Sequence, residues 1–277
     1  MNVAAHQQEV MEKQRFEFGK NWQAYLSEFD ARRMKRAETS LKEALELDDL
    51  GGLGFLDIGC GSGVFSLSAA SLGARVTSFD YDPHSVACTR QVKARFAPQR
   101  EDWEIAEGSA LDPGFLASLG TFDIVYSWGV LHHTGKMWEA LANAGTRVRP
   151  GGTLMIAIYN DQGRYSRGWM AIKQAYNRLP RALRFLVLLP AFLRLWGPRT
   201  VADLFTGRPF RTWRKYSQER GMSPWRDVVD WVGGLPFEVA KPEEIIEFFM
   251  RRGFRLARLR TCAGGHGCNE FTFRLGP

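Results

Sequence analysis

A glycine-rich turn between two acidic residues is the stretch of this sequence with the clearest chemical potential. The turn holds Gly59, Gly61 and Gly63, with Asp57 at the end of the apolar run before it and Asp80 at the end of the next. Glycines in a strand-turn-helix unit let the backbone approach a ligand, and the following helix presents unpaired amide groups. The pattern therefore predicts a nucleotide site.

The spacing of the turn separates two kinds of nucleotide. A dinucleotide site uses G-x-G-x-x-G, and Val64 stands where the third glycine would admit the pyrophosphate. Asp57 suits a ligand with a cationic amino-acid group, and Asp80 can accept hydrogen bonds from both hydroxyls of a ribose. These residues favour S-adenosylmethionine (SAM) over NAD as the cofactor.

Four stretches resemble those of the class I SAM-dependent methyltransferases. DIGCGSG, which begins at Asp57, is similar to the family's first motif, and VTSFD, which ends at Asp80, is similar to the second. FDIVYSWGVLHH from Phe122 and RVRPGGTL from Arg147 resemble the fourth strand and the turn before the fifth. Within the family, the chain is most similar in general to the ubiquinone-biosynthesis and small-molecule O-methyltransferases.

The resemblance covers about residues 53–159 and, more loosely, residues 242–275. It departs from the family pattern at Ser109, which stands where an acidic residue often lies beside the adenine. Carried over residue by residue, it implies cofactor contacts from Asp57, Gly59, Gly61, Gly63, Asp80, Tyr81, Ser109, Ala110 and Trp128.

Two histidines follow the predicted fourth strand, at the edge where open α/β sheets bind ligands. His133, or alternatively His132, is the candidate base that takes a proton from the acceptor during methyl transfer. The competing interpretation is that both rings serve packing and contacts with the cofactor loop.

Candidate substrate-binding residues come from three places downstream. Each has a structural alternative: a capping turn after the fifth strand, a small core within residues 216–238, and a flexible hairpin loop between the last two strands. Cys262, His266 and Cys268 lack a further ligand beside them, so no metal is expected. The predicted substrate residues are Tyr159, Asn160, Arg164, Tyr165, Asp230, Trp231, His266 and Asn269.

Short apolar runs alternate with helical stretches, which predicts the elements that position these residues. The fold class is α/β, a Rossmann-like sheet of seven strands, mostly parallel with an antiparallel last strand. The predicted strands are residues 54–58, 75–79, 103–106, 122–127, 153–159, 254–261 and 269–275. The predicted units are an N-terminal helical cap (1–50), a SAM-binding core (51–160), a helical substrate-recognition insertion between strands five and six (161–241), and a C-terminal completion of the core (242–277). The aromatic residues of the cap from Phe16 to Trp22 are predicted to close over the cofactor.

Charge is concentrated in the insertion. The net charge is +7, and residues 178–215 hold nine basic side chains against the single acid Asp203. This segment predicts peripheral contact with the inner face of a membrane or with a lipid-linked acceptor. A pair of helices packed on the core is the alternative, and the segment is expected to be too short and too charged to span a bilayer, with Pro190 interrupting it.

The leading function is a SAM-dependent methyltransferase that acts on a small-molecule or glycan- or lipid-linked acceptor, at oxygen. The alternatives are an RNA or protein methyltransferase that uses the basic insertion, and a non-catalytic SAM-binding module. Aliphatic rather than stacking aromatic residues lie between the arginines, which argues against nucleic acid as a partner. The N-terminus lacks the layout of a signal peptide and the four cysteines form no CxxC pair, so we expect a cytoplasmic protein of unspecified oligomeric state.

Overall fold

The computed structural model describes residues 2–19, 31–220 and 223–277. Seven strands form one sheet in the order β3-β2-β1-β4-β5-β7-β6. Strand β7 runs antiparallel to β5 and β6, and the pairs among β1 to β5 are parallel, which confirms the predicted fold class. The strands are β1 (Gly54–Ile58), β2 (Arg75–Asp80), β3 (Trp103–Glu107), β4 (Phe122–Trp128), β5 (Val148–Tyr159), β6 (Phe254–Arg260) and β7 (Cys268–Leu275).

The fifth strand begins five residues before the predicted start at residue 153. Val148 pairs with Phe122 across a register shift, and the pairing carries the strand through the predicted turn at Pro150 to Gly152. Gly151 takes the left-handed conformation there, with φ at 74°, which a larger residue adopts only with strain. The glycine pair thus allows an irregular strand where a turn was expected.

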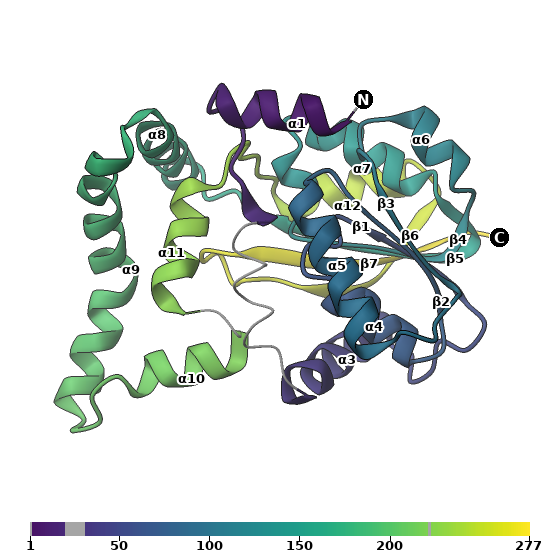
Figure 1. The fold of residues 1–277 in the computed structure, drawn as a ribbon, viewed down its shortest axis with the longest axis horizontal. Helices are drawn as coiled ribbons and strands as arrows, with labels where there is room; N and C mark the ends of the chain where they lie inside the picture. The colour runs from purple at the N-terminus through teal and green to yellow at the C-terminus, as the bar shows by residue number, and fades with distance from the viewer. Residues whose placement is uncertain (1, 20–30, 221–222) are drawn as a thin grey trace.

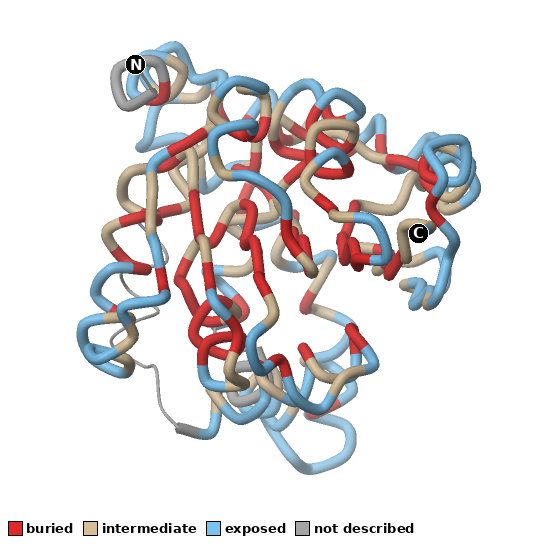
Figure 2. Tube along the Cα trace, turned by 90° about the vertical axis from the view of Figure 1, so that its right-hand side faces the viewer, coloured by how far each residue is buried: buried red, intermediate tan, exposed pale blue. Residues whose placement is uncertain are grey.

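Helices cover both faces of the sheet. On one face, α3 (Ala31–Leu45), α4 (Val64–Ser71) and α5 (Pro83–Phe96) pack around Phe55 and Trp103. On the other, α6 (Pro113–Ser118), α7 (Met137–Gly145) and α12 (Pro242–Met250) pack around Leu56 and Phe249. Buried stretches gather inside the trace in Figure 2, while the outward turns of the helices are exposed.

Before the sheet, α1 (Asn2–Met11) lies at the top of Figure 1 and α3 lies below. Of the aromatic residues predicted to form a lid, Phe16 and Phe18 are described. Trp22 falls outside the described residues.

The insertion between β5 and β6 forms a separate helical layer at the left of Figure 1. Its own hydrophobic cluster includes Trp169, Trp196 and Val228. The elements are α8 (Arg164–Arg178), the 3-10 helix η2 (Arg181–Leu183), α9 (Phe185–Phe205), α10 (Arg211–Arg220) and α11 (Pro224–Gly233).

Two expectations for the basic segment were wrong. Helix α9 continues through both Pro190 and Pro198, because both prolines lie on its exposed side, where solvent can bond the carbonyl groups that they leave unpaired. The stretch Arg181–Phe205 is also long and apolar enough, by length and composition alone, to cross a membrane.

Candidate active site

The carboxyl ends of β1, β2 and β4 open into one cavity of about 600 Å³. It brings together most of the predicted cofactor residues, together with His133 and Asp230. The predicted cofactor residues on its wall are Asp57, Gly59, Gly61, Asp80, Tyr81, Ser109, Ala110 and Trp128.

The three glycines of the turn have different roles. Gly59 has a φ of 77°, and a Cβ atom added there would lie 2.3 Å from Val130, so only glycine fits. The Gly61 amide donates a hydrogen bond to Asp80 Oδ2 at 2.9 Å. Gly63 precedes α4 and packs against Thr89 instead of lining the cavity, whereas the Val64 side chain lines the wall. The turn therefore brings backbone to the cavity without the opening that a pyrophosphate needs.

Asp57 is almost completely buried at the cavity wall, with 2% of its surface exposed. Its Oδ2 atom accepts a hydrogen bond from Ser66 Oγ, which also lies 2.7 Å from Ser78 Oγ. Burial raises the pKa of Asp57 to about 7, against the opposing effect of the Ser66 hydrogen bond. A buried carboxyl with such a pKa favours a cationic ligand, which would compensate its negative charge.

Asp80 is held by backbone amides on both of its oxygens. Oδ2 accepts from Gly61 N and Oδ1 accepts from Asp82 N, each at 2.9 Å. Burial raises its pKa to about 6, while these amide hydrogen bonds act in the opposite direction. The carboxylate is oriented at the end of β2 with further lone pairs for two ribose hydroxyls.

The remaining cofactor candidates ring the same space. Ser109 Oγ accepts from Leu111 N at 3.1 Å, so the residue that replaces the family's acid fixes its own turn. Trp128 Nε1 donates to Glu270 Oε1 at 3.1 Å, and Glu270 also lines the cavity. Glu270 was not among the predicted site residues, although its neighbour Asn269 was; side chains alternate between the two faces of β7, and of this pair Glu270 lines the cavity.

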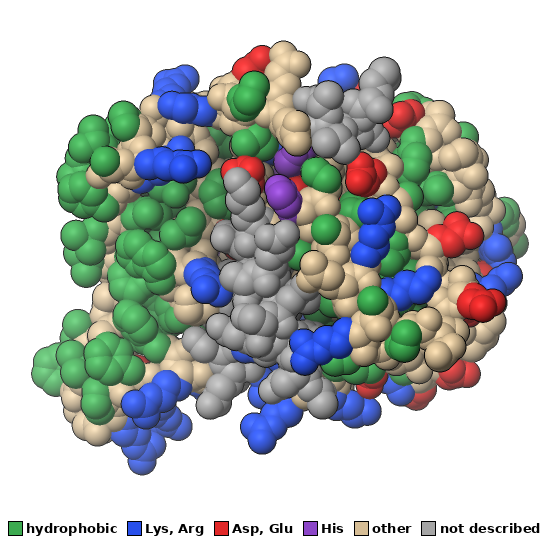
Figure 3. Space-filling model, in the orientation of Figure 1, with side chains coloured by type: hydrophobic (Ala, Val, Ile, Leu, Met, Phe, Trp, Pro, Cys, Tyr) green, Lys and Arg blue, Asp and Glu red, His purple; other side chains and the backbone are tan. Residues whose placement is uncertain are grey.

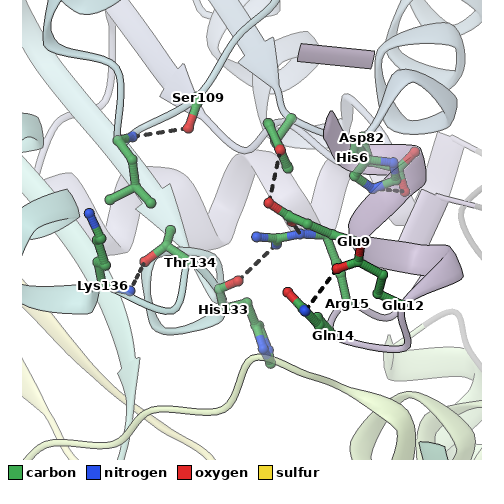
Figure 4. Close-up of polar contacts among 12 residues, drawn as sticks. His6, Glu9, Glu12, Gln14, Arg15, Asp82, Ser109, His133, Thr134 and Lys136 are labelled. Atoms are coloured by element: carbon green, nitrogen blue, oxygen red, sulfur yellow. Dashed lines mark hydrogen bonds and ion pairs between the residues drawn. The ribbon is translucent and has the colours of Figure 1, made fainter. Parts of the chain in front are cut away.

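Helix α1 closes one side of the cavity through contacts that the sequence analysis also missed (Figure 4). His6 lies edge-on to Tyr81 at 5.4 Å between ring centroids, and Tyr81 donates to Glu9 Oε1 at 3.2 Å. Arg15 donates to Glu9 at 2.6 Å and to the backbone oxygen of His133 at 2.9 Å, with its guanidinium 4.8 Å from the Tyr81 ring centroid. Arg15 therefore connects the cap to both ends of the cavity.

The two histidines occupy different environments. His133 lines the cavity, and its Nδ1 atom lies 2.6 Å from the Pro236 carbonyl oxygen, so Nδ1 carries the proton and Nε2 keeps a lone pair. Burial lowers the pKa of His133 to about 3. His132 is completely buried outside the cavity wall, where its Nδ1 accepts from Tyr159 N at 3.3 Å, and burial lowers its pKa well below 6.5. The geometry favours His133 over His132 as a proton acceptor.

Most predicted substrate residues lie away from the cavity wall. Asn269 Nδ2 donates to Asn160 Oδ1 at 3.0 Å, which fixes the residue after β5 to the start of β7. The Trp231 ring packs within 5.5 Å of the Tyr159, Trp169 and His266 rings, and its carbonyl oxygen accepts from the buried Lys173 amine. Arg164 and Tyr165 are exposed at the start of α8. Of this set, only Asp230 lines the cavity, beside Asp227.

Four cysteines are free, and among residues 2–19, 31–220 and 223–277 no three His, Cys, Asp or Glu side chains are grouped so as to hold a metal ion. The cavity wall in the described part is built from carboxyls, backbone amides, aromatic rings, the imidazoles of His6 and His133, and arginines that include Arg15. These groups fit the cationic amino acid, the ribose and the adenine of SAM.

Comparison with known proteins agrees with this geometry. Residues 56–154 match the family model described as a methyltransferase domain. A ubiquinone biosynthesis O-methyltransferase of Methylobacterium sp. (strain 4-46) is 32% identical over 125 residues, which cover 43% of this chain and 46% of that protein. The enzyme of the same name from Methylocella silvestris is 26% identical over 72% of this chain and 66% of its own length. The chain thus spans about half to two thirds of the length of these bacterial relatives.

Two solved structures share the fold. Magnesium protoporphyrin IX methyltransferase from Synechocystis PCC 6803, with bound SAH, has a TM-score of 0.51 at 14% identity, over 88% of this chain and 83% of that one. N-methyltransferase NodS from Bradyrhizobium japonicum WM9, in complex with SAH, has a TM-score of 0.50 at 16% identity, over 95% and 100% of the two chains. Because the matching family model spans the glycine turn and the strands that carry both aspartates of the cavity, residues 56–154 form a SAM-dependent methyltransferase domain.

Proposed function

We propose that this chain transfers the methyl group of SAM to an oxygen atom of a small-molecule or glycan- or lipid-linked acceptor in the cytoplasm. The observation that carries the proposal is the single cavity that joins Asp57 and Asp80 to the imidazole of His133. Four free cysteines agree with a reducing compartment.

Bound SAM supplies an electrophilic methyl group on a sulfonium, and the chain has to align that group with the acceptor and exclude water. Asp57 compensates the cationic end of the cofactor, and Asp80 accepts hydrogen bonds from its ribose. Arg15 and Tyr81 hold α1 against the same side of the cavity, which shields it from solvent.

His133 is the proposed proton acceptor. Its Nε2 lone pair would take the proton of the acceptor hydroxyl, which would leave the oxygen ready for the methyl group that bound SAM supplies. The Pro236 carbonyl then stabilises the imidazolium through Nδ1–H. The proton thus moves from the acceptor oxygen to His133 Nε2, and no oxidant or reductant is needed.

Aromatic rings support a flat, partly apolar acceptor at this end. Phe16 and Phe18 line the cavity, and the Phe18 ring lies 4.9 Å from the His133 ring. A phenol or quinol fits this lining, and the names of the bacterial relatives favour oxygen as the atom that is methylated.

Two measurements test the proposal. Calorimetry should detect SAH binding that Asp80→Ala abolishes and the exposed control Asp48→Ala leaves unchanged. Methyl-tritiated SAM should then label a phenolic, quinol or lipid-linked acceptor in an enzyme-dependent way. Absence of SAH binding would refute the proposed cofactor site, and binding without labelling of any acceptor would indicate a non-catalytic SAM-binding module.

A further inference from the structure

Helix α9 presents an apolar stripe to solvent along its outer side. Leu186, Leu189, Leu193 and Leu204 recur at spacings that place them on one face, and each has half or more of its surface exposed. Phe205, at the end of the helix, is 89% exposed. Figure 3 shows hydrophobic side chains gathered at the left of the molecule, over the position of α9. We call this surface the α9 outer face; scattered single leucines are ordinary, but a continuous stripe marks an interaction site.

The opposite side of α9 is anchored to the insertion. Leu188, Ala191 and Trp196 are buried, and the Trp196 ring lies 4.8 Å from the Tyr216 ring of α10. Asp203 is buried and accepts hydrogen bonds from both the backbone nitrogen and the hydroxyl of Thr212, each at 2.7 Å. A helix attached in this way to its neighbours lies on the protein surface with one face free, so its composition suits an interfacial position instead of a spanning one.

Basic side chains border the α9 outer face. Within residues 178–215 the only acid is Asp203, which is buried and turned toward Thr212. Figure 3 shows basic side chains directly beside the hydrophobic group, most clearly at the lower left. The exposed basic residues of this segment are Arg178, Arg181, Arg194, Arg199, Arg208, Arg211, Arg214 and Lys215.

We propose that the α9 outer face docks the chain onto a bilayer that contains anionic lipids. Exposed leucines would enter the boundary between headgroups and acyl chains while the arginines contact lipid phosphates. A second copy of the chain is a poorer occupant, because a two-fold interface would bring the same arginines of both copies together. Charge complementarity therefore selects the anionic bilayer.

Docking has a consequence for the acceptor, and this step rests on the proposed methyl transfer. Figure 1 shows α11 between α9 and the sheet, and α11 carries Asp227 and Asp230 of the cavity wall. A single helix layer thus separates the docked face from the cavity. An acceptor held in the membrane by a lipid chain is the class that this arrangement favours.

Vesicle cosedimentation of the purified full chain tests the docking. It should sediment with phosphatidylcholine vesicles that contain phosphatidylglycerol, and less with phosphatidylcholine alone or at high salt. Leu189→Asp/Leu193→Asp should lower the partition coefficient by about a hundredfold or more, since two leucines are lost and each buried leucine contributes about tenfold or more. The control Met250→Asp, at an exposed apolar site on the core, should leave it unchanged.

Charge is tested in the same assay. Arg181→Gln/Arg208→Gln should weaken binding by about fivefold for each arginine removed, whereas Arg90→Gln/Arg255→Gln on the core should have little effect. Unchanged SAH binding checks that each variant is folded. The proposal is overturned if the parent chain does not sediment with anionic vesicles, if the leucine variant sediments equally, or if light scattering shows a dimer that this variant dissociates in the absence of vesicle binding. Docking without SAH binding would refute the proposed function alone.

Discussion

The Nδ1 atom of His133 lies 2.6 Å from the carbonyl oxygen of Pro236, so Nε2 is the unprotonated nitrogen of a ring that lines the cavity. A carbonyl can only accept, and this contact therefore fixes the tautomer. Because burial lowers the pKa of His133 to about 3, the ring is neutral throughout the neutral pH range. The free ring is thus unprotonated at neutral pH, and its proposed role requires that the bound acceptor raise its pKa.

Replacement of His133 should reduce turnover much more than cofactor binding. His133→Ala is expected to lower kcat by about a hundredfold to ten-thousandfold, the range typical for loss of a general base. Calorimetric SAH affinity should change little, since the ring faces the acceptor end. His84→Ala on α5, outside the cavity wall, is the matched control, and an unchanged kcat in His133→Ala would exclude the proposed role.

Cofactor affinity should rise with pH. Without ligand, the pKa values of Asp57 and Asp80 are about 7 and about 6, so both carboxyls become protonated as pH falls through this window. A cationic ligand binds the ionised forms, and its binding should release protons. Isothermal titration in buffers of different ionisation enthalpy measures this release. Asp57→Asn should bind SAM more weakly and flatten the dependence near pH 7; an equally steep profile in this variant would contradict the assignment.

Stability without ligand should follow the opposite trend. The folded-state pKa of Asp57 is raised, so protonation favours the folded chain, and this contribution is complete below the unfolded value near 3.8 and is lost as pH rises through about 7. Asp57→Asn should therefore raise the free energy of unfolding by about 2 to 4 kcal/mol at pH above 7 and have little effect at low pH. Denaturant titrations across this range measure the difference, with Asp48→Asn as the exposed control.

Local motifs sufficed to predict much of the fold and the cofactor half of the site. Asp57 lies near the end of β1, just before the glycine turn, and Asp80 ends the neighbouring strand β2, so their placement follows from topology. Arg15 and His133 are 118 residues apart, and nothing local in the sequence signals their hydrogen bond. The same holds for Glu270, which reaches Trp128 only because β7 enters the sheet beside β5.

The substrate residues could not be separated from packing residues by sequence. Aromatic and polar residues near strand ends suit a pocket and a small core equally well, and Trp231 and Tyr159 lie within the insertion's own cluster. Pro190 was expected to interrupt the helix, but α9 continues through it. The sequence does not indicate that this side of the helix faces solvent, where the unpaired carbonyl group can bond to water.

Arg15 should matter for closure of the cap. Arg15→Ala removes hydrogen bonds to Glu9 and to the His133 backbone together with the contact on Tyr81. We expect SAH affinity to fall by about tenfold and amide hydrogen exchange in α1 to increase, because charged hydrogen bonds of this kind contribute about 1.5 to 3 kcal/mol. Gln14→Ala, at an exposed neighbour, should change neither; unaltered exchange in Arg15→Ala would show that other contacts hold α1 closed.

The glycine turn allows a test that separates backbone strain from crowding. Gly59 and Gly120 both have positive φ, 77° and 82°, but a Cβ atom would lie 2.3 Å from Val130 at Gly59 and would meet nothing within 4 Å at Gly120. Gly120→Ala should therefore lower the free energy of unfolding by about 1 kcal/mol, the cost of the left-handed conformation alone. Gly59→Ala should cost about 1 to 3 kcal/mol more, since Val130 has to move. Val130→Ala in the Gly59→Ala background should recover part of that excess free energy. If the double-mutant cycle showed no coupling between the two sites, a side chain at Gly59 would be excluded by backbone strain and not by contact with Val130.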